Sequence, residues 1–189
     1  MLVNAVMEGA DLPPRPLLIT FDDGNSDNYF NAFPIMQKYG FTGVVYIIGN
    51  YMGTPGYMNA DQIKVMAAAG WEVGSHSMSH LDLSELDPQR QRYEIVESRE
   101  KLESELGFHV MTFAYPFGIT STEIIDYTQF AGYIAGMGLG SSADQFRSNL
   151  YNLQRSDVKG TFDFKQFISL LPWRGDPIYL PTNTPTPTP

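Results

Sequence analysis

The chain has 189 residues, of which 43% are hydrophobic and 13% aromatic, so it can fold around a substantial core. Its formal net charge of −9, from 12 basic and 21 acidic residues, argues against a nucleic-acid-binding surface and against binding to anionic lipid. It contains no cysteine, which excludes disulfides, a thiolate nucleophile and any cysteine-ligated zinc site.

Neither a membrane span nor an export signal is expected in this sequence. No apolar run approaches the roughly 20 residues that a transmembrane helix needs. The first segment, Met1 to Asp11, carries acidic residues and no basic n-region, which is unlike a signal peptide. If the protein is exported, its signal lies outside this sequence.

Apolar runs and helix-like segments alternate along the chain. The expected strands are Leu17–Thr20, Gly43–Ile48, Glu72–Ser75, Val110–Ala114, Tyr133–Met137 and Leu150–Arg155. The expected helices are Asn28–Tyr39, Asn59–Ala69, Pro88–Leu106, Thr122–Phe130 and Phe162–Leu171. This alternation predicts an α/β fold, in which parallel strands joined by right-handed crossovers form an open sheet or a barrel.

The C-terminal segment differs from the rest in composition. Residues 181–189 form a Thr/Pro repeat, which is typical of an extended, solvated linker between modules of extracellular proteins. We therefore expect one globular domain over residues 1–180 and a linker or tail over residues 181–189. The tract could join this domain to another module or end without a partner.

Two short polar blocks follow expected strands. The first is Thr20-Phe21-Asp22-Asp23-Gly24, and by itself it is also consistent with an ordinary turn. The second, Ser75 to His80, holds two of the three histidines, His76 and His80, at a spacing that suits a metal on one face of a helical turn. Alone, it could equally be a pair of solvent-facing histidines.

Together the two blocks offer two carboxylates and two imidazoles where parallel strands end. Such a set can hold one divalent metal ion and leave one carboxylate free as a base, which suffices to hydrolyse an amide or ester with water. A third block, Phe113 to Gly118, also follows a strand but is typical of a simple turn. His109 precedes that strand, so we expect it at the opposite end of the sheet, as a surface or packing residue.

Taken in order, the three blocks resemble those of the polysaccharide deacetylases, carbohydrate esterase family 4. The resemblance covers roughly residues 15–171 and implies a distorted (β/α)7-type barrel that hydrolyses acetyl groups on sugars with the help of a metal. By position, it makes Asp22 the catalytic base and the backbone N–H of Phe117 a donor to the oxyanion. It makes Asp23, His76 and His80 the ligands of one divalent ion. Zinc is the expected ion, with cobalt and nickel as alternatives.

Two departures from the family pattern bear on the site. Many members carry an arginine where this chain has Ala114, and its Phe-Ala-Tyr-Pro-Phe-Gly block resembles a bacterial subgroup that includes deacetylases of exopolysaccharide poly-N-acetylglucosamine. Arg155 is the predicted replacement partner of Asp22, although it could instead pair with Asp157 alone. No histidine follows His109 to act as a general acid, so Asp22 or Asp157 would return the proton, or the leaving group needs little help.

The expected function is that of a secreted or cell-surface deacetylase acting on an N-acetylglucosamine polymer: peptidoglycan, chitin or an exopolysaccharide. An O-acetyl esterase acting on xylan or another sugar is the alternative, and an inactive carbohydrate-binding barrel is the non-enzymatic one. A two-histidine, one-carboxylate iron oxygenase is a rival enzyme class. Its sites are built on antiparallel β-folds, so the alternation of strands and helices argues against it. Substrate choice would depend on loops such as Gly49–Tyr57 and Gly138–Asn149, whose shapes the sequence does not give.

Overall fold

The computed structural model describes residues 2–142 and 144–171. The chain divides into two compact units, residues 1–157 and residues 158–189. The Thr/Pro tract expected at residues 181–189 lies outside the described residues. None of the helices in the described ranges is long and apolar enough to cross a membrane.

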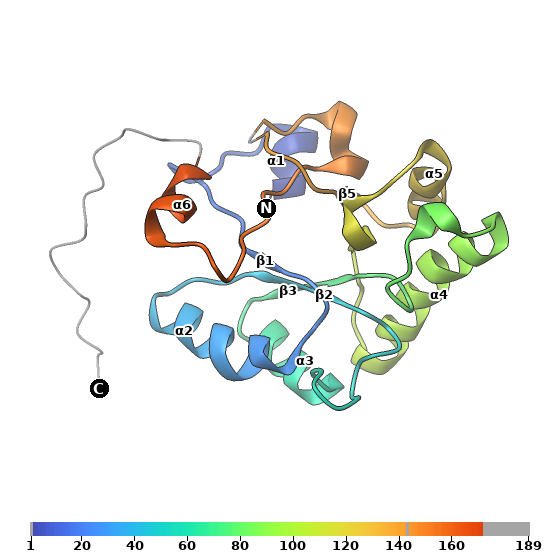
Figure 1. Cartoon of the computed structure of the whole chain (residues 1–189), viewed down its shortest axis with the longest axis horizontal. Helices are drawn as coiled ribbons and strands as arrows, with labels where there is room; N and C mark the ends of the chain where they lie inside the picture. Colours follow the sequence, from blue (N-terminus) through green and yellow to red (C-terminus); the bar gives the residue numbers. More distant parts are fainter. Residues whose placement is uncertain (1, 143, 172–189) are drawn as a thin grey trace, which may run out of the picture. The chain divides into compact units, whose positions relative to one another are not determined.

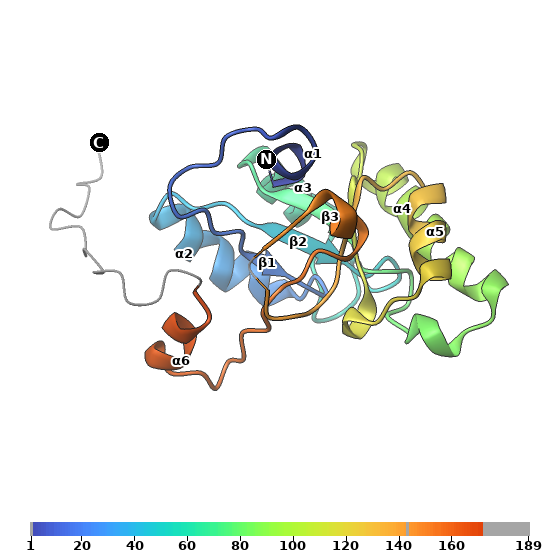
Figure 2. The ribbon, with the colours of Figure 1, turned by 90° about the horizontal axis from the view of Figure 1, so that it is seen from above.

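The first unit is built on a five-stranded sheet with the strand order β1-β2-β3-β4-β5. The strands are β1 (Thr20–Phe21), β2 (Val44–Ile47), β3 (Glu72–Ser75), β4 (Thr112–Ala114) and β5 (Ala135–Met137). Every neighbouring pair is parallel, with Val45 opposite Val73 and Phe113 opposite Gly136. The strands curl into a half-barrel flanked by helices, which confirms the expected α/β class with a distorted barrel of parallel strands (Figures 1 and 2).

Helices cover both faces of this sheet. Those of the first unit are α1 (Leu2–Glu8), α2 (Phe33–Lys38), α3 (Ala60–Ala68), α4 (Pro88–Leu106) and α5 (Thr122–Phe130). In Figure 1, α2 and α3 lie beneath the sheet and α1 lies on the opposite side. The helix α1 has no counterpart among the elements expected from the sequence. In the second unit the described residues include α6 (Phe164–Ser169), where the expected last helix lay.

The strand β2 shows why its sequence is a continuous apolar run. Val45 and Ile47 point into one core cluster with the helices, whereas Val44 and Tyr46 point into a second cluster on the other face. All four side chains are almost fully buried. A strand that is covered on both faces loses the alternation of apolar and polar residues, as is usual in parallel sheets.

Two expected elements differ in the structure. The helix expected over Asn28–Tyr39 begins as a π-helix, η1 (Asn28–Ala32), and becomes α-helical only at Phe33. Pro34 follows directly and has no N–H to donate to the preceding turn, which gives a physical reason for the change.

The strand expected over Leu150–Arg155 was largely wrong. Residues 147–152 form a 3-10 helix, η4 (Arg147–Asn152), in which the Asn149 side chain accepts a hydrogen bond of 2.7 Å from the Phe146 amide. This local turn chemistry outweighs strand propensity. Only the last residues run beside β5: Leu153 bridges Met137, and the Gly140 amide donates to the Arg155 carbonyl at 3.0 Å.

Gly74 in β3 is a position where the sheet has no room for a side chain. A Cβ there would collide with the Tyr46 ring and lie 2.9 Å from the Thr112 carbonyl oxygen. We expect Gly74→Ala to lower the free energy of unfolding by about 1–3 kcal/mol, as overpacking typically does. Urea denaturation would measure the loss, with Gly160→Ala as the control because nothing lies within 4 Å of a Cβ there. Equal stability of the two variants would contradict this expectation.

Candidate active site

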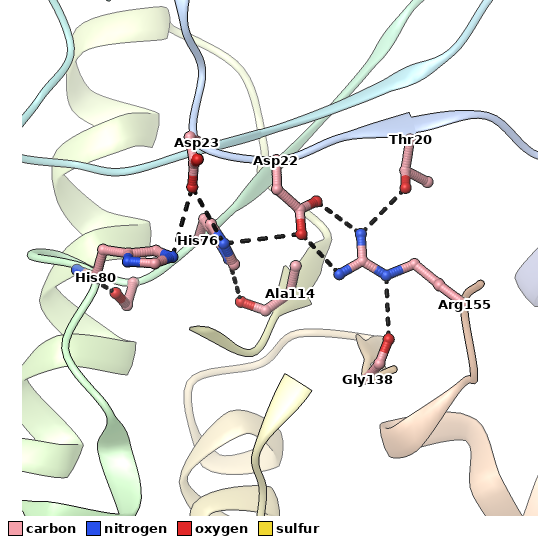
Figure 3. Close-up of polar contacts among 9 residues, drawn as sticks. Thr20, Asp22, Asp23, His76, His80, Ala114, Gly138 and Arg155 are labelled. Carbon is pink, nitrogen blue, oxygen red and sulfur yellow. Dashed lines mark hydrogen bonds and ion pairs between the residues drawn. The ribbon is translucent and has the colours of Figure 1, made fainter. Parts of the chain in front are cut away.

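The three polar blocks converge at the carboxyl ends of the strands. Asp22 and Asp23 follow β1 directly, His76 follows β3, and Ala114 is the last residue of β4. Because parallel strands end at one edge of the sheet, these residues meet there although they lie far apart in sequence (Figure 3).

Asp23, His76 and His80 form a cluster that could hold a metal ion. One ligand atom from each lies within 4.8 Å of the other two. Asp23 Oδ1 is 3.6 Å from His76 Nε2 and 3.5 Å from His80 Nε2 (Figure 3). One carboxylate and two imidazoles are a donor set that zinc and related divalent ions accept, with positions left for water and substrate. The chemistry of these residues therefore fits the metal that the sequence led us to expect.

His76 is prepared for such a role by its surroundings. Its Nδ1 is 2.8 Å from the Ala114 carbonyl oxygen, which can only accept, so Nδ1 carries the proton and the Nε2 lone pair faces Asp23. Burial lowers the pKa of His76 and outweighs the opposing effect of the Asp22 carboxylate. The ring is therefore held in the neutral form that binds metals.

The segment that carries the two histidines is not helical, contrary to the spacing argument. It is an irregular loop in which Ser77 and His80 have positive φ angles of 64° and 56°. Among the described residues, the other non-glycine positions with positive φ are Arg15, Asp23 and Phe117. Four of these five therefore lie in the candidate site, and strained backbone of this kind is concentrated at functional sites.

Asp22 is held by Arg155 through both of its oxygens. Arg155 Nη1 donates to Oδ1 at 2.6 Å and Nη2 donates to Oδ2 at 2.8 Å (Figure 3). Burial raises the pKa of Asp22, but the hydrogen bonds and charge of Arg155, together with His76 and His80, lower it by more, so the pKa lies below its ordinary value. Asp22 is thus ionised and fixed in orientation, while its Oδ2 lies 3.8 Å from His76 Nε2.

Arg155 reaches Asp22 from the far edge of the sheet. The short stretch after η4 pairs with β5, whereas Asp22 follows β1 at the other edge. Only a curled sheet brings these edges within one side-chain length. Three further contacts fix the guanidinium: Nε donates to the Gly138 carbonyl at 3.2 Å, Nη1 donates to the Thr20 hydroxyl at 3.1 Å, and Cζ lies 5.3 Å from the centre of the Tyr46 ring.

The other residues predicted for the site have different positions. Phe117 lies in the 3-10 turn η3 (Pro116–Gly118) just after β4, with its ring centre 4.8 Å from that of His80. Asp157 is exposed, and among the described residues Arg155 forms its ion pair with Asp22. His109 is 82% exposed before β4, at the end away from the histidine loop, as expected.

Several contributors to the site were not predicted. Thr20 belongs to the first block, but its position in an expected strand does not indicate a contact with Arg155. Ala114 and Gly138 contribute backbone carbonyls, which no side-chain type reveals in a sequence. In the loop Gly49–Tyr57, the side-chain amide of Asn50 donates to the Ser79 hydroxyl at 3.0 Å, and the rings of Tyr51 and Tyr57 are in contact. This loop therefore reaches the histidine loop.

A family model for polysaccharide deacetylases matches residues 9–136, about two thirds of the chain. The chain belongs to the polysaccharide deacetylase family. YxkH of Bacillus subtilis (strain 168), a protein named for the same family, is 32% identical over 142 residues, which are 75% of this chain and 51% of YxkH.

A second relative of this polysaccharide deacetylase domain is the poly-beta-1,6-N-acetyl-D-glucosamine N-deacetylase of Staphylococcus aureus (strain MRSA252). It is 29% identical over 157 residues, which are 76% of this chain and 54% of that protein. The chain thus spans about half the length of the curated relatives it matches. The solved structure of Streptococcus pyogenes deacetylase PplD in complex with acetate has the same fold, with a TM-score of 0.84 over 90% of this chain and 76% of that chain at 22% identity.

Proposed function

We propose that this domain is a metal-dependent deacetylase that removes N-acetyl groups from a polymer of N-acetylglucosamine. The observation that carries the proposal is that a fixed carboxylate and a candidate metal cluster lie within one side-chain length of each other. A carboxylate fixed by Arg155 lies beside a cluster of one carboxylate and two imidazoles that fits a divalent ion. A base next to a metal site is the equipment for hydrolysis with water.

Asp23, His76 and His80 would hold the ion, and zinc suits the mixed nitrogen and oxygen donors, with cobalt and nickel as alternatives. When bound, a divalent ion supplies Lewis-acid chemistry: it polarises a carbonyl and makes water more acidic. Asp22 is not among the clustered ligands in this assignment, and the two hydrogen bonds from Arg155 orient it as the base beside them.

The residues of the chain then have distinct tasks. Asp22 accepts a proton from the water whose oxygen adds to the acetyl carbonyl carbon. The amide N–H of Phe117 donates to the oxygen that becomes negative, as a preorganised donor does in other acyl-transfer sites. The C–N bond breaks, the amine nitrogen takes up a proton, which Asp22 can return, and acetate leaves. Arg155 orients Asp22 throughout and touches neither reactant.

The named relative supports the proposed substrate class. The Staphylococcus aureus protein is named as acting on poly-beta-1,6-N-acetyl-D-glucosamine, and a substrate of that kind is the first one to test here. We further propose that the protein acts outside the cell or at its surface, because polymers of this class are found there. The Thr/Pro tract at residues 181–189 would then link the domain to another module.

Acetate release tests the function directly. The zinc-loaded protein is incubated with poly-N-acetylglucosamine, chitin oligomers, peptidoglycan and acetylated xylan, with and without a chelator. Chelator-sensitive acetate release from an N-acetylglucosamine polymer is the expected result. Release that a chelator leaves untouched would reject the metal-dependent mechanism, and no release from any N-acetylated polymer would reject N-deacetylation.

One observation favours O-deacetylation as a second candidate. The chain has three histidines, two of which are assigned to the metal and the third of which, His109, is exposed near the other end of β4. No histidine therefore remains to protonate a leaving group. An ester leaves more readily than an amine without such help, so acetylated xylan belongs in the panel as a positive alternative.

Arg155 is predicted to be a positioning residue for Asp22. Arg155→Met removes both hydrogen bonds and the charge that lower the Asp22 pKa. We expect kcat to fall with little change in KM. Because the base must be ionised and its pKa would rise, the acidic limb of the pH–rate profile should move to higher pH.

Arg155→Lys is the matched variant for this test. It keeps the charge but loses the planar fork, so it should restore the position of the acidic limb better than it restores kcat. Zinc content, measured in each variant, should stay at the level of the unchanged protein. An Arg155→Met enzyme with the original kcat and pH profile would show that another group orients Asp22.

A further inference from the structure

Glu94 is a buried carboxylate with no part in the chemistry described above. It lies within α4, and its side chain has no exposed surface. Burying a charge is costly unless the charge is paired and hydrogen-bonded. The groups that contact Glu94 therefore indicate which part of the fold this carboxylate stabilises.

Those contacts are directed at the loop between the two histidines. The Ser79 amide donates to Glu94 Oε2 at 2.7 Å, and the Met78 amide donates to the Glu94 backbone carbonyl at 3.0 Å. One residue of α4 thus binds two consecutive amides just before His80. The other oxygen, Oε1, forms an ion pair with Arg90 Nη2 at 2.9 Å, without the alignment of a hydrogen bond.

The loop needs such external support because its own backbone is strained. Ser77 and His80 both have positive φ, a conformation that costs on the order of 1–3 kcal/mol for each such residue. Within the loop, one hydrogen bond, from the His80 amide to the Ser77 hydroxyl at 2.9 Å, opposes this cost. The short bond from the Ser79 amide to a carboxylate is of the charge-assisted kind, which is about twice as strong as a neutral one.

A neutral amide could not replace this carboxylate without loss. Glutamine has one acceptor oxygen and one amino group in place of two acceptor oxygens. If its oxygen faced the Ser79 amide, its amino group would face the guanidinium of Arg90, and the opposite orientation would set two donors against each other at Ser79. Either arrangement disturbs the peptide that precedes His80.

We infer that Glu94 is a positioning residue that holds the His80 imidazole where it can join Asp23 and His76 around a divalent ion. The inference rests on the proposed metal centre. Glu94 itself forms its side-chain contacts with Ser79 and Arg90 and, among the described contacts, has no hydrogen bond or ion pair with Asp23, His76 or His80. It acts through the Ser79 amide and the Met78 amide on the loop that carries His80.

The test is the affinity of the full chain for Zn²⁺, measured by competition with a chromophoric chelator, in Glu94→Gln and in Glu100→Gln. Glu100 lies on the exposed side of the same helix and undergoes the same change of charge. We expect Glu94→Gln to weaken Zn²⁺ binding by about 10–100-fold, as is typical when a ligand-orienting partner is removed. Glu100→Gln should bind Zn²⁺ as the unchanged protein does.

The melting temperature of each metal-free variant separates positioning from general support of the fold. A folded Glu94→Gln protein with a lower melting temperature but unchanged Zn²⁺ affinity would overturn the inference. If Glu94→Gln does not fold, Glu94→Asp replaces it, because it keeps the charge but is too short to keep the Ser79 bond, and unchanged affinity there would overturn the inference equally. Failure of the unchanged protein to bind Zn²⁺ would instead reject the metal centre of the proposed function, and this inference with it.

Discussion

Replacing Asp22 by asparagine is expected to lower kcat by about 10²–10⁴-fold, which is the usual contribution of a positioned general base. Asparagine has nearly the same shape and can still accept a hydrogen bond from Arg155, but its side chain cannot take a proton from water. Asp22 is not one of the three clustered ligands, and Arg155 holds it through both of its oxygens. Bound zinc should therefore stay at the level of the unchanged protein, as elemental analysis after dialysis would show.

The control for this change is Asp126→Asn, which makes the same replacement at an exposed position of α5. It should retain full acetate release. An Asp22→Asn protein that loses zinc would mean that the roles of Asp22 and Asp23 have been exchanged. One that keeps both zinc and full turnover would show that a different group takes the proton.

The positions of Asp22, Asp23 and His76 could be predicted because they depend on the most regular part of the fold. A buried parallel strand can be recognised in a sequence as a short apolar run, and functional residues lie where such strands end. Both signals are present before Asp22 and before His76. The partner of Asp22 could also be predicted. Because Ala114 stands where many family members have an arginine, Asp22 needs another cation, and Arg155 lies near the end of a late segment beside the sheet.

The backbone of the histidine loop and of residues 147–152 could not be predicted in the same way. In both, hydrogen bonds between side chains and nearby amides decide the conformation, such as Ser77 with His80 and Asn149 with Phe146. Asn and Ser occur in turns, caps and solvent-facing positions alike, so their presence does not say which amide they bind. The spacing of His76 and His80 fitted a helical turn, but positive φ angles bring their rings together instead.

Glu94 illustrates a different limit. On a long, charged helix a glutamate is ordinarily solvated, and its neighbours in sequence do not distinguish it from Glu97 or Glu100. Only the packing of α4 against the loop after β3 makes its side chain fully buried. A contact between distant segments, rather than a local pattern, thus gives this residue its place beside the site.

Replacing His80 by alanine is expected to have the largest effect on the metal. Of the three ligand atoms that lie within 4.8 Å of one another, two remain. One belongs to Asp23, after β1, and the other to His76, after β3. The loss of zinc affinity should exceed the roughly 10–100-fold expected for a residue that only orients a ligand. Because His80 is about a quarter exposed, the fold itself should change little in stability.

His109→Ala is the matched control for this prediction, since it removes a histidine that is 82% exposed before β4 and paired with Glu103 at 3.5 Å. It should keep zinc, acetate release and their reversible loss with a chelator. His80→Ala should lose zinc on dialysis and lose acetate release with it, and added zinc should restore release only at concentrations well above those that saturate the unchanged protein. A His80→Ala protein that retains one zinc per chain after dialysis would show that the ion is held elsewhere, and the assignment of Asp23 and His76 would fail with it.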